Sequence, residues 1–216
     1  MTRTAALALG LAVAAGAFGA AWRLASGGPE IPAHTAAAHA LVEPAPLCPW
    51  REPQRDLRQF FPGATGIHEE TRILSHLRVA LIHDLGRPLT AEEMLLRPFR
   101  ILKGGKLVGT MLVRRVKGEF GAIELVLAVT PDGRVRGLRL QRQREPEAVA
   151  AGLTSPKWLG AFREKTAGSP LQVGKDLPGV SSEASVSAKA VAAGVRSLLV
   201  LLRAAELHGR EGGRAA

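Results

Sequence analysis

The sequence predicts an α+β domain in which an antiparallel β meander packs with helices. Two observations favour this class: several short apolar segments follow one another through tight turns, and a long apolar-striped helix closes the chain. The turn segments are Lys103-Gly-Gly-Lys106 and Pro131-Asp-Gly133. Glycine accepts the positive φ that such turns need, and proline presets φ at the turn entrance. With 216 residues, of which 46% are hydrophobic, the chain is long enough to build a core.

The N-terminal quarter is expected to lie outside the folded domain. Residues 1–25 are typical of a signal peptide or an uncleaved membrane anchor, because a short basic start precedes an uncharged run from Ala5 to Trp22. Whether the leader is cleaved stays open. A buried helix is the alternative, but the many glycines and the missing polar face disfavour it. Residues 26–55 are rich in Pro and Ala and predict an extended linker, followed by the domain at 56–208 and a frayed tail at 209–216.

The first half of the domain is predicted to contain a helix followed by the strands. Glu69–Leu85 has apolar residues at helical spacing and ends at Gly86. The predicted inner face carries Ile73, Leu77, Ala80 and Leu81. A short helical piece is expected at Ala91–Leu96. The strands are expected at Phe99–Leu102, Leu107–Val116, Ile123–Val129 and Val135–Arg142.

The second half is predicted to be mainly helical. Pro146–Gly152 is polar and expected to be flexible, whereas Pro156–Phe162 predicts a short helix. Trp158 and Phe162 are four residues apart and are expected to pack together in the core rather than on a ligand. Val173–Leu177 is a candidate last strand. The strongest helix is Ser187–Leu207, with Gly209 as its predicted cap and an apolar stripe formed by Val191, Val195, Leu198, Leu199 and Leu202.

Charge and residue usage exclude several function classes. The net charge is +10, but Lys and Arg are spread along the chain and no recognised nucleic-acid module is present, so we expect no nucleic-acid partner. A basic surface that faces anionic lipid or an acidic redox partner fits the charge equally well. The single Cys48 excludes an internal disulfide and multi-cysteine metal sites. His76 and His83 lie two helical turns apart, too far to share one metal ion, and no catalytic triad or metal site is predicted.

A Gly/Ser-rich loop that leads directly into the last helix is the most informative stretch of the chain. It runs from Asp176 to Val191. Hydroxyl groups and free backbone N–H groups at the positive end of a helix dipole commonly hold a phosphate. The candidate cofactor-binding residues are Ser181, Ser182, Ala184, Ser185 and Ser187. The same residues also suit a plain helix cap, and this alternative stays open.

Short motifs along the chain follow a known order and spacing. They are Phe60-Phe-Pro-Gly-Ala64, Leu107-Val-Gly109, Val116-Lys-Gly118, Ala128–Val135, Arg144-Glu145, Trp158–Phe162, Lys165–Leu171, Asp176-Leu-Pro178 and Ser185-Val-Ser187. Together they cover roughly Phe60 to Leu202. Their order resembles the FMN-binding domain of subunits of the Rnf complex and of the sodium-pumping NADH:quinone reductase, and of related extracytoplasmic flavoproteins.

The resemblance implies that FMN is bound at the loop before the last helix. In that family a flavin transferase often esterifies the flavin phosphate onto a threonine of a Ser-Gly-Ala-Thr loop. Ser185 takes the place of that threonine and Ala184 that of the alanine. Glu145 matches a glutamate near the flavin, although from the residues alone it is interpreted as a surface carboxylate. Glu183 departs from the pattern, because it replaces the glycine with a bulkier, negatively charged side chain.

The implied function is electron transfer at the membrane rather than stand-alone catalysis. The resemblance implies a location on the extracytoplasmic side of the bacterial cell envelope, attachment through residues 1–25, redox partner proteins, and a flavin transferase that modifies Ser185. Glu183 favours an alternative, a cofactor-free member of the same fold that acts as an envelope scaffold or assembly partner. A third alternative is a basic module that docks on lipid headgroups.

Overall fold

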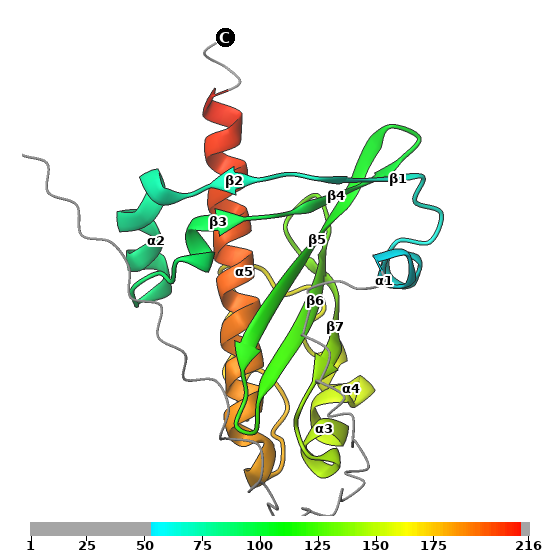
Figure 1. Ribbon diagram of the computed structural model, residues 1–216, viewed down its shortest axis with the longest axis vertical. Coiled ribbons are helices and arrows are strands. Elements are labelled where there is room, and N and C mark those ends of the chain that lie inside the picture. The colour runs from blue at the N-terminus through cyan, green and yellow to red at the C-terminus, as the bar shows by residue number, and fades with distance from the viewer. Residues whose placement is uncertain (1–52, 213–216) are drawn as a thin grey trace, which may run out of the picture. The chain divides into compact units, whose positions relative to one another are not determined.

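The computed structural model describes residues 53–212. The predicted leader at 1–25, the linker up to residue 52 and the last four residues lie outside the described residues. The described part forms an antiparallel sheet packed with helices, which confirms the α+β class (Figure 1).

A five-stranded antiparallel sheet forms the centre of the domain, with the strand order β1-β4-β5-β6-β7. The strands are β1 (Gly66–Glu69), β4 (Phe99–Lys103), β5 (Lys106–Lys117), β6 (Ala122–Val129) and β7 (Val135–Gln143). The predicted meander from β4 to β7 is therefore confirmed. Gly104, Gly105 and Gly133 have positive φ at the predicted turns, where a residue with a Cβ would be strained.

Helix α5 (Ser185–Gly212) packs its apolar stripe against one face of this sheet. The five predicted stripe residues are at most 5% exposed. Gly194 allows close contact, because an added Cβ would lie 2.5 Å from Val116 Cγ1 on β5. Within the described residues α5 has the length and composition of a membrane span, but 67% of its apolar window is buried in the domain, as expected for a core helix. The predicted cap at Gly209 is wrong, because the helix continues to Gly212.

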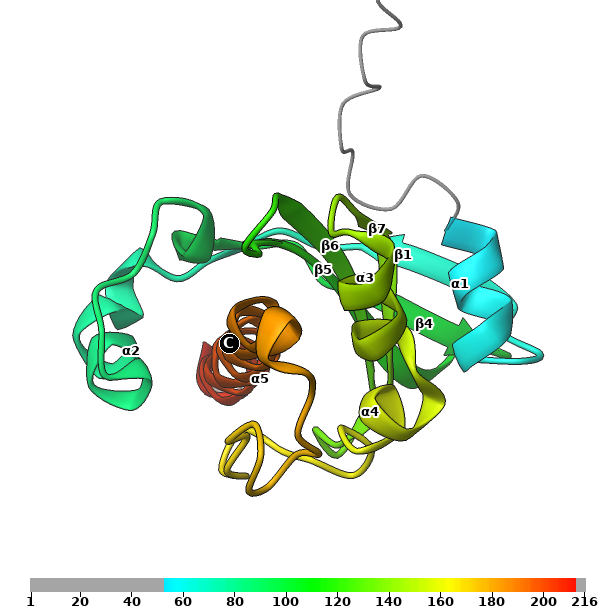
Figure 2. The same cartoon turned by 90° about the horizontal axis from the view of Figure 1, so that it is seen from below.

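The opposite face of the sheet carries a smaller core with helix α1 (Pro53–Phe60). Figure 2 shows α1 and α5 on opposite sides of the sheet. The rings of Phe60 and Phe61 pack directly against two glycines of the sheet. A Cβ added at Gly137 would lie 2.5 Å from Phe60, and one added at Gly109 would lie 2.2 Å from Phe61. The sheet is thus covered on both faces.

The long helix predicted for Glu69–Leu85 is mostly wrong. Only α2 (Arg78–Leu85) is α-helical, with a one-turn helix η1 (Ser75–Leu77) before it and Gly86 in the left-handed region after it. The preceding residues form β1 and β2 (Arg72–Ile73). Leu77 and Leu81 are buried as predicted, but Ile73 is 65% exposed and Ala80 is also exposed. Pairing of β1 with β4 outweighs the helical spacing of the apolar residues.

The remaining elements also refine the predictions. The piece predicted at Ala91–Leu96 is a one-turn helix η2 (Glu92–Met94) followed by β3 (Leu95–Leu96), which pairs with β2. The segment predicted as flexible instead contains α3 (Glu147–Thr154), with Val149 and Leu153 buried. The candidate last strand is only a single bridge between Val173 and Leu177.

The predicted aromatic pair is confirmed. Trp158 belongs to α4 (Pro156–Gly160), and its ring centroid lies 4.9 Å from that of Phe162 in an edge-to-face arrangement. Both side chains are at most 1% exposed, so they are core residues.

Candidate functional site

The Gly/Ser-rich loop enters α5 through a single tight turn, η3 (Ser182–Ala184). Ser181 precedes this turn with extended backbone. The N–H of Ala184 donates to the carbonyl of Ser181 at 3.1 Å, and the N–H of Ser185 donates to that of Ser182. The Ala184 and Ser185 N–H groups are therefore used by the turn. By the rule for helix starts, the N–H groups of Ser182 and Glu183 have no partner inside the helix.

The predicted site residues divide into an outer and an inner group. Ser181 and Ser182 are exposed and Ser185 is half-buried, whereas Ala184 and Ser187 are fully buried. Glu183 is exposed, so its side chain does not fill the start of the helix. Of the predicted serines, Ser181, Ser182 and Ser185 are thus at least partly open to solvent, whereas Ser187 is not.

Ser187 and Glu145, which are 42 residues apart in sequence, meet beneath this loop. The Ser187 hydroxyl donates to Glu145 Oε2 at 2.9 Å and accepts from the backbone N–H of Glu119 at 2.9 Å. Glu145 is 7% exposed, so its interpretation as a surface carboxylate is wrong. Its second oxygen, Oε1, is buried and has no hydrogen-bond partner among the described residues.

The turn between β5 and β6 completes this buried cluster. A Cβ added at Gly118 would lie 2.1 Å from Glu145 Oε1 and 3.0 Å from Ser187 Oγ, so only glycine fits there. The turn is closed by the Gly118 N–H, which donates to the carbonyl of Gly121 at 2.8 Å. We name Gly118, Glu119, Glu145 and Ser187 the buried lock, because they fix the β5–β6 turn, the segment before α3 and the start of α5 to one another.

The sequence indicated Ser187 and Glu145 but not their contact. Glu119 was not predicted, because a backbone N–H donor leaves no mark on the residue type. Gly118 occurs in one of the family-like motifs, which is the only signal that pointed to the turn.

A second buried carboxylate, Glu93, lies away from this site and holds the α2 region to the sheet and α5. Its side chain is fully buried and accepts hydrogen bonds from Arg87, from Arg114 and from the Thr90 N–H at 2.9 Å. Arg87 also donates to Ser197 of α5 at 2.7 Å. Burial would raise the pKa of Glu93, but the bonds from Arg87 and Thr90 and the charge of Arg114 lower it from 4.5 to about 2.

Within residues 53–212, no cluster of three or more His, Cys, Asp or Glu side chains is arranged to hold a metal ion. What the start of α5 offers is different. Three serines that are at least partly exposed, Ser181, Ser182 and Ser185, lie at the positive end of a helix of 28 residues, together with N–H groups that have no partner inside the helix. This arrangement suits an anionic group such as a phosphate, and the Ser185 hydroxyl is able to form an ester with it.

Comparisons with known proteins agree in part with the resemblance seen in the motifs. No family model matches the chain. A component of the proton-translocating ferredoxin:NAD(+) oxidoreductase complex of Clostridium ljungdahlii is 33% identical to the chain over 99 residues, which cover 44% of this chain and 53% of the relative. The chain thus spans about half the length of this curated relative. Over that stretch, it is similar to a subunit of an oxidoreductase complex.

A solved structure, NqrC from Shewanella oneidensis, overlaps 66% of this chain and 80% of its own length, with 15% sequence identity and a TM-score of 0.41. A TM-score of this size is too low to establish a common fold.

Proposed function

We propose that this protein is an FMN-binding subunit that passes electrons within a membrane oxidoreductase complex. The observation that carries the proposal is the half-buried Ser185 at the start of α5, at the threonine position of the family-like loop. The similarity to a subunit of a ferredoxin:NAD(+) oxidoreductase complex supports the same class of function.

The outer residues fit the phosphate of FMN. The Ser185 hydroxyl would form the phosphoester or a hydrogen bond, and Ser181 and Ser182 would add hydroxyl contacts. The N–H groups of Ser182 and Glu183 would donate to the phosphate, which would lie at the positive end of the helix dipole. Each hydrogen bond to the charged phosphate is worth about 1.5–3 kcal/mol.

The inner residues would act by position rather than by contact. Ser187 and Ala184 are fully buried, and the Ser187 hydroxyl already bonds to Glu145 and Glu119. The buried lock therefore holds the loop in the shape that presents Ser185. Glu145 Oε1 lacks a donor among the described residues. When bound, FMN would supply one- and two-electron transfer.

The proposal also includes the setting of the protein. Residues 1–25 would direct export and either anchor the chain or be removed, which would place the domain on the extracytoplasmic side of the bacterial envelope. Its partners would be the membrane, redox proteins of the same complex and a flavin transferase that acts on Ser185. The chain would then be an electron carrier rather than a stand-alone enzyme.

A cofactor-free scaffold is the second candidate, and Glu183 favours it. This carboxylate lies two residues from Ser185, where it would repel a phosphate dianion unless it stays in solvent. Its exposure is compatible with the solvent-facing arrangement.

The test compares flavin content in matched serine variants. We expect the chain, produced with its export machinery and a flavin transferase, to purify with flavin absorbance and with flavin fluorescence that survives denaturation. Ser185→Ala should abolish the covalent signal, and Ser181→Ala should retain it. Glu183→Gly should raise flavin occupancy. Absence of flavin from the native chain, with equal results for both alanine variants, would favour the scaffold.

A further inference from the structure

A hollow of about 880 Å³ lies beside the C-terminal half of α5, away from Ser185. Three parts of the chain surround it: the last turns of α5, the paired strands β4 and β5, and the loops at 130–133 and 166–168. Its lining on α5 begins at Leu199, and the 14 residues of helix from Ser185 to Leu199 span about 21 Å. We name it the distal hollow, because it is separate from the proposed flavin site.

The floor and the rim of the distal hollow are apolar. Leu199 and Leu202 of α5 are at most 5% exposed and form the floor. Leu107 at the start of β5 and Leu207 near the end of α5 are 40% and 54% exposed, so apolar surface at the rim stays in contact with water. A concave, mainly apolar surface of this size is typical of small-molecule sites.

Every charged side chain that lines the distal hollow already has an ionic partner. Two of these side chains are cationic, Arg100 and Arg203, and two are anionic, Asp132 and Glu206, so their charges cancel. An ionised ligand would therefore lose water without gaining a counter-charge, which is unfavourable. The ion pairs are Arg100 with Glu206 and Glu70, Arg203 with Asp84, and Asp132 with Arg134.

Arg100 adds a polar group with unused hydrogen-bonding capacity. Its side chain is only 12% exposed. Its Nε donates to Glu70 and its Nη1 to Thr110 Oγ1, both at 3.1 Å, and its Nη2 donates to Glu206. A guanidinium group carries five N–H donors, so two of them make no hydrogen bond within residues 53–212. A ligand in the hollow is able to use these donors only if it carries an acceptor.

We infer that the distal hollow binds an uncharged, mainly apolar small molecule that carries a carbonyl oxygen. The apolar part of the molecule would lie against the four leucines of the floor and the rim. The carbonyl oxygen would accept from Arg100, which its three existing bonds already hold in place. The inference does not depend on flavin binding, because the two sites share no residue.

The probe for the test is benzophenone, a neutral diaryl ketone that bonds covalently to nearby C–H groups under ultraviolet light. The full chain in mild detergent is irradiated with it, both with and without flavin, and peptide mass spectrometry locates the adducts. We expect adducts on the leucines that line the distal hollow in both cases. Labelling without any bound flavin would support this inference and count against the flavin proposal alone.

Two charged analogues test the electrostatic argument. They are the anion 4-benzoylbenzoate and the cation 4-(aminomethyl)benzophenone, which carry the same photoreactive ketone. Each should label the leucines of the distal hollow about tenfold less than benzophenone does, because the charges that line the hollow are already paired. Equal labelling by either analogue would overturn the inference.

Competition tests the role of the carbonyl oxygen. Fluorenone and fluorene have the same ring system, but only fluorenone carries a carbonyl group. Fluorenone should suppress labelling at about tenfold lower concentration, because fluorene gains no hydrogen bond from the guanidinium group. Equal competition by the two compounds would overturn the inference.

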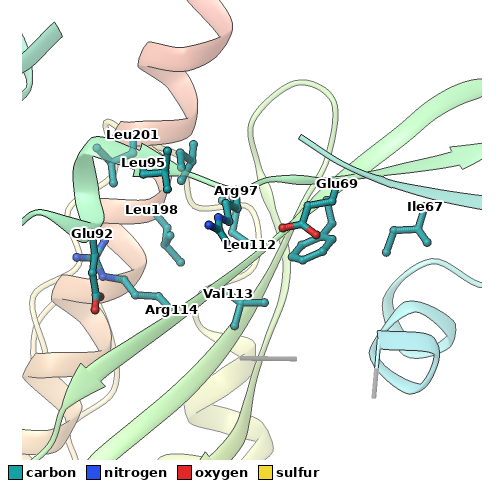
Figure 3. A pocket seen from close by; sticks show the side chains of 12 residues that line it. Ile67, Glu69, Glu92, Leu95, Arg97, Leu112, Val113, Arg114, Leu198 and Leu201 are labelled. Carbon is teal, nitrogen blue, oxygen red and sulfur yellow. The ribbon is translucent and has the colours of Figure 1, made fainter. Parts of the chain in front are cut away.

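Two leucine variants test the location. Leu107→Glu puts a charge at the rim and should reduce labelling of α5 about tenfold. The matched control Leu95→Glu changes a leucine of almost equal exposure, 38%, which lines a different hollow bordered by β3, β5 and α5 (Figure 3). This control should leave labelling unchanged. Equal effects of the two variants, or adducts mainly outside the distal hollow, would overturn the inference.

Discussion

Replacing Ser187 with alanine removes a single oxygen atom from the centre of the buried lock. That oxygen donates to Glu145 Oε2 and accepts from the Glu119 N–H, both at 2.9 Å, and the residue is 0% exposed. In the variant both oxygens of a buried carboxyl group and one backbone N–H would lack partners within the described part of the chain. Burial would prevent water from replacing the bonds readily.

The magnitude follows from the kinds of bond that are lost. A hydrogen bond to a buried carboxylate contributes about 1.5–3 kcal/mol, and an orphaned backbone N–H adds about 1 kcal/mol. We therefore expect the free energy of unfolding to fall by about 3 kcal/mol, which lowers Tm by about 6–12 °C in a domain of this size.

The assay is urea unfolding of the flavin-free chain, followed by circular dichroism. The matched control is Ser185→Ala, which removes a half-buried hydroxyl outside the buried lock and should change stability by less than about 0.5 kcal/mol. If Ser187→Ala and Ser185→Ala behave alike, the buried lock does not hold the start of α5, and the positioning role of the inner residues is refuted.

Three further predictions concern packing and pH. Gly118→Ala should lower the free energy of unfolding by about 2 kcal/mol or more, since the added Cβ would lie 2.1 Å from Glu145 Oε1. A free energy from urea unfolding within about 0.5 kcal/mol of the wild-type value would contradict this. Gly194→Ala should destabilise the domain despite a helix-propensity gain of about 1 kcal/mol, because the added Cβ would clash with Val116. The control Gly160→Ala adds a Cβ that meets no atom within 4 Å and should not destabilise the domain. A melting temperature of Gly194→Ala that is not below that of Gly160→Ala would contradict this. Glu93→Gln should lower the free energy of unfolding by about 2–3 kcal/mol near neutral pH, because only the ionised carboxylate is stabilised by Arg87 and Arg114. The difference in unfolding free energy between wild type and variant should disappear as pH falls from 4.5 through about 2. A difference that does not change with pH would refute the assignment.

The spacing of apolar residues correctly predicted the strands and the helix whose buried faces follow that spacing. The strands β4 to β7 and helix α5 carry regular apolar spacing, and the sheet and the stripe of α5 follow it. The failure at Glu69–Leu85 has a non-local cause: β1 forms because Gly66–Glu69 pairs with Phe99–Leu102, about thirty residues or more away. Helical spacing within the segment carries no information about that partner.

The candidate site shows the same limit. The sequence picks out the serines at the start of α5, because Ser and Gly residues before an apolar helix have a recognisable chemistry. It does not reveal that Ser187 faces inward, or that Glu145, between Arg144 and Pro146, is buried against Gly118. That β5 extends past the start of β4 also becomes visible only when the two strands are paired.

Native mass spectrometry of the chain, produced together with its export machinery and a flavin transferase, tests the proposed flavin binding most directly. We expect one FMN per chain, and loss of that mass increment in the Ser185→Ala variant if the bond is an ester. A native mass equal to that of the bare polypeptide under these conditions would contradict the proposal.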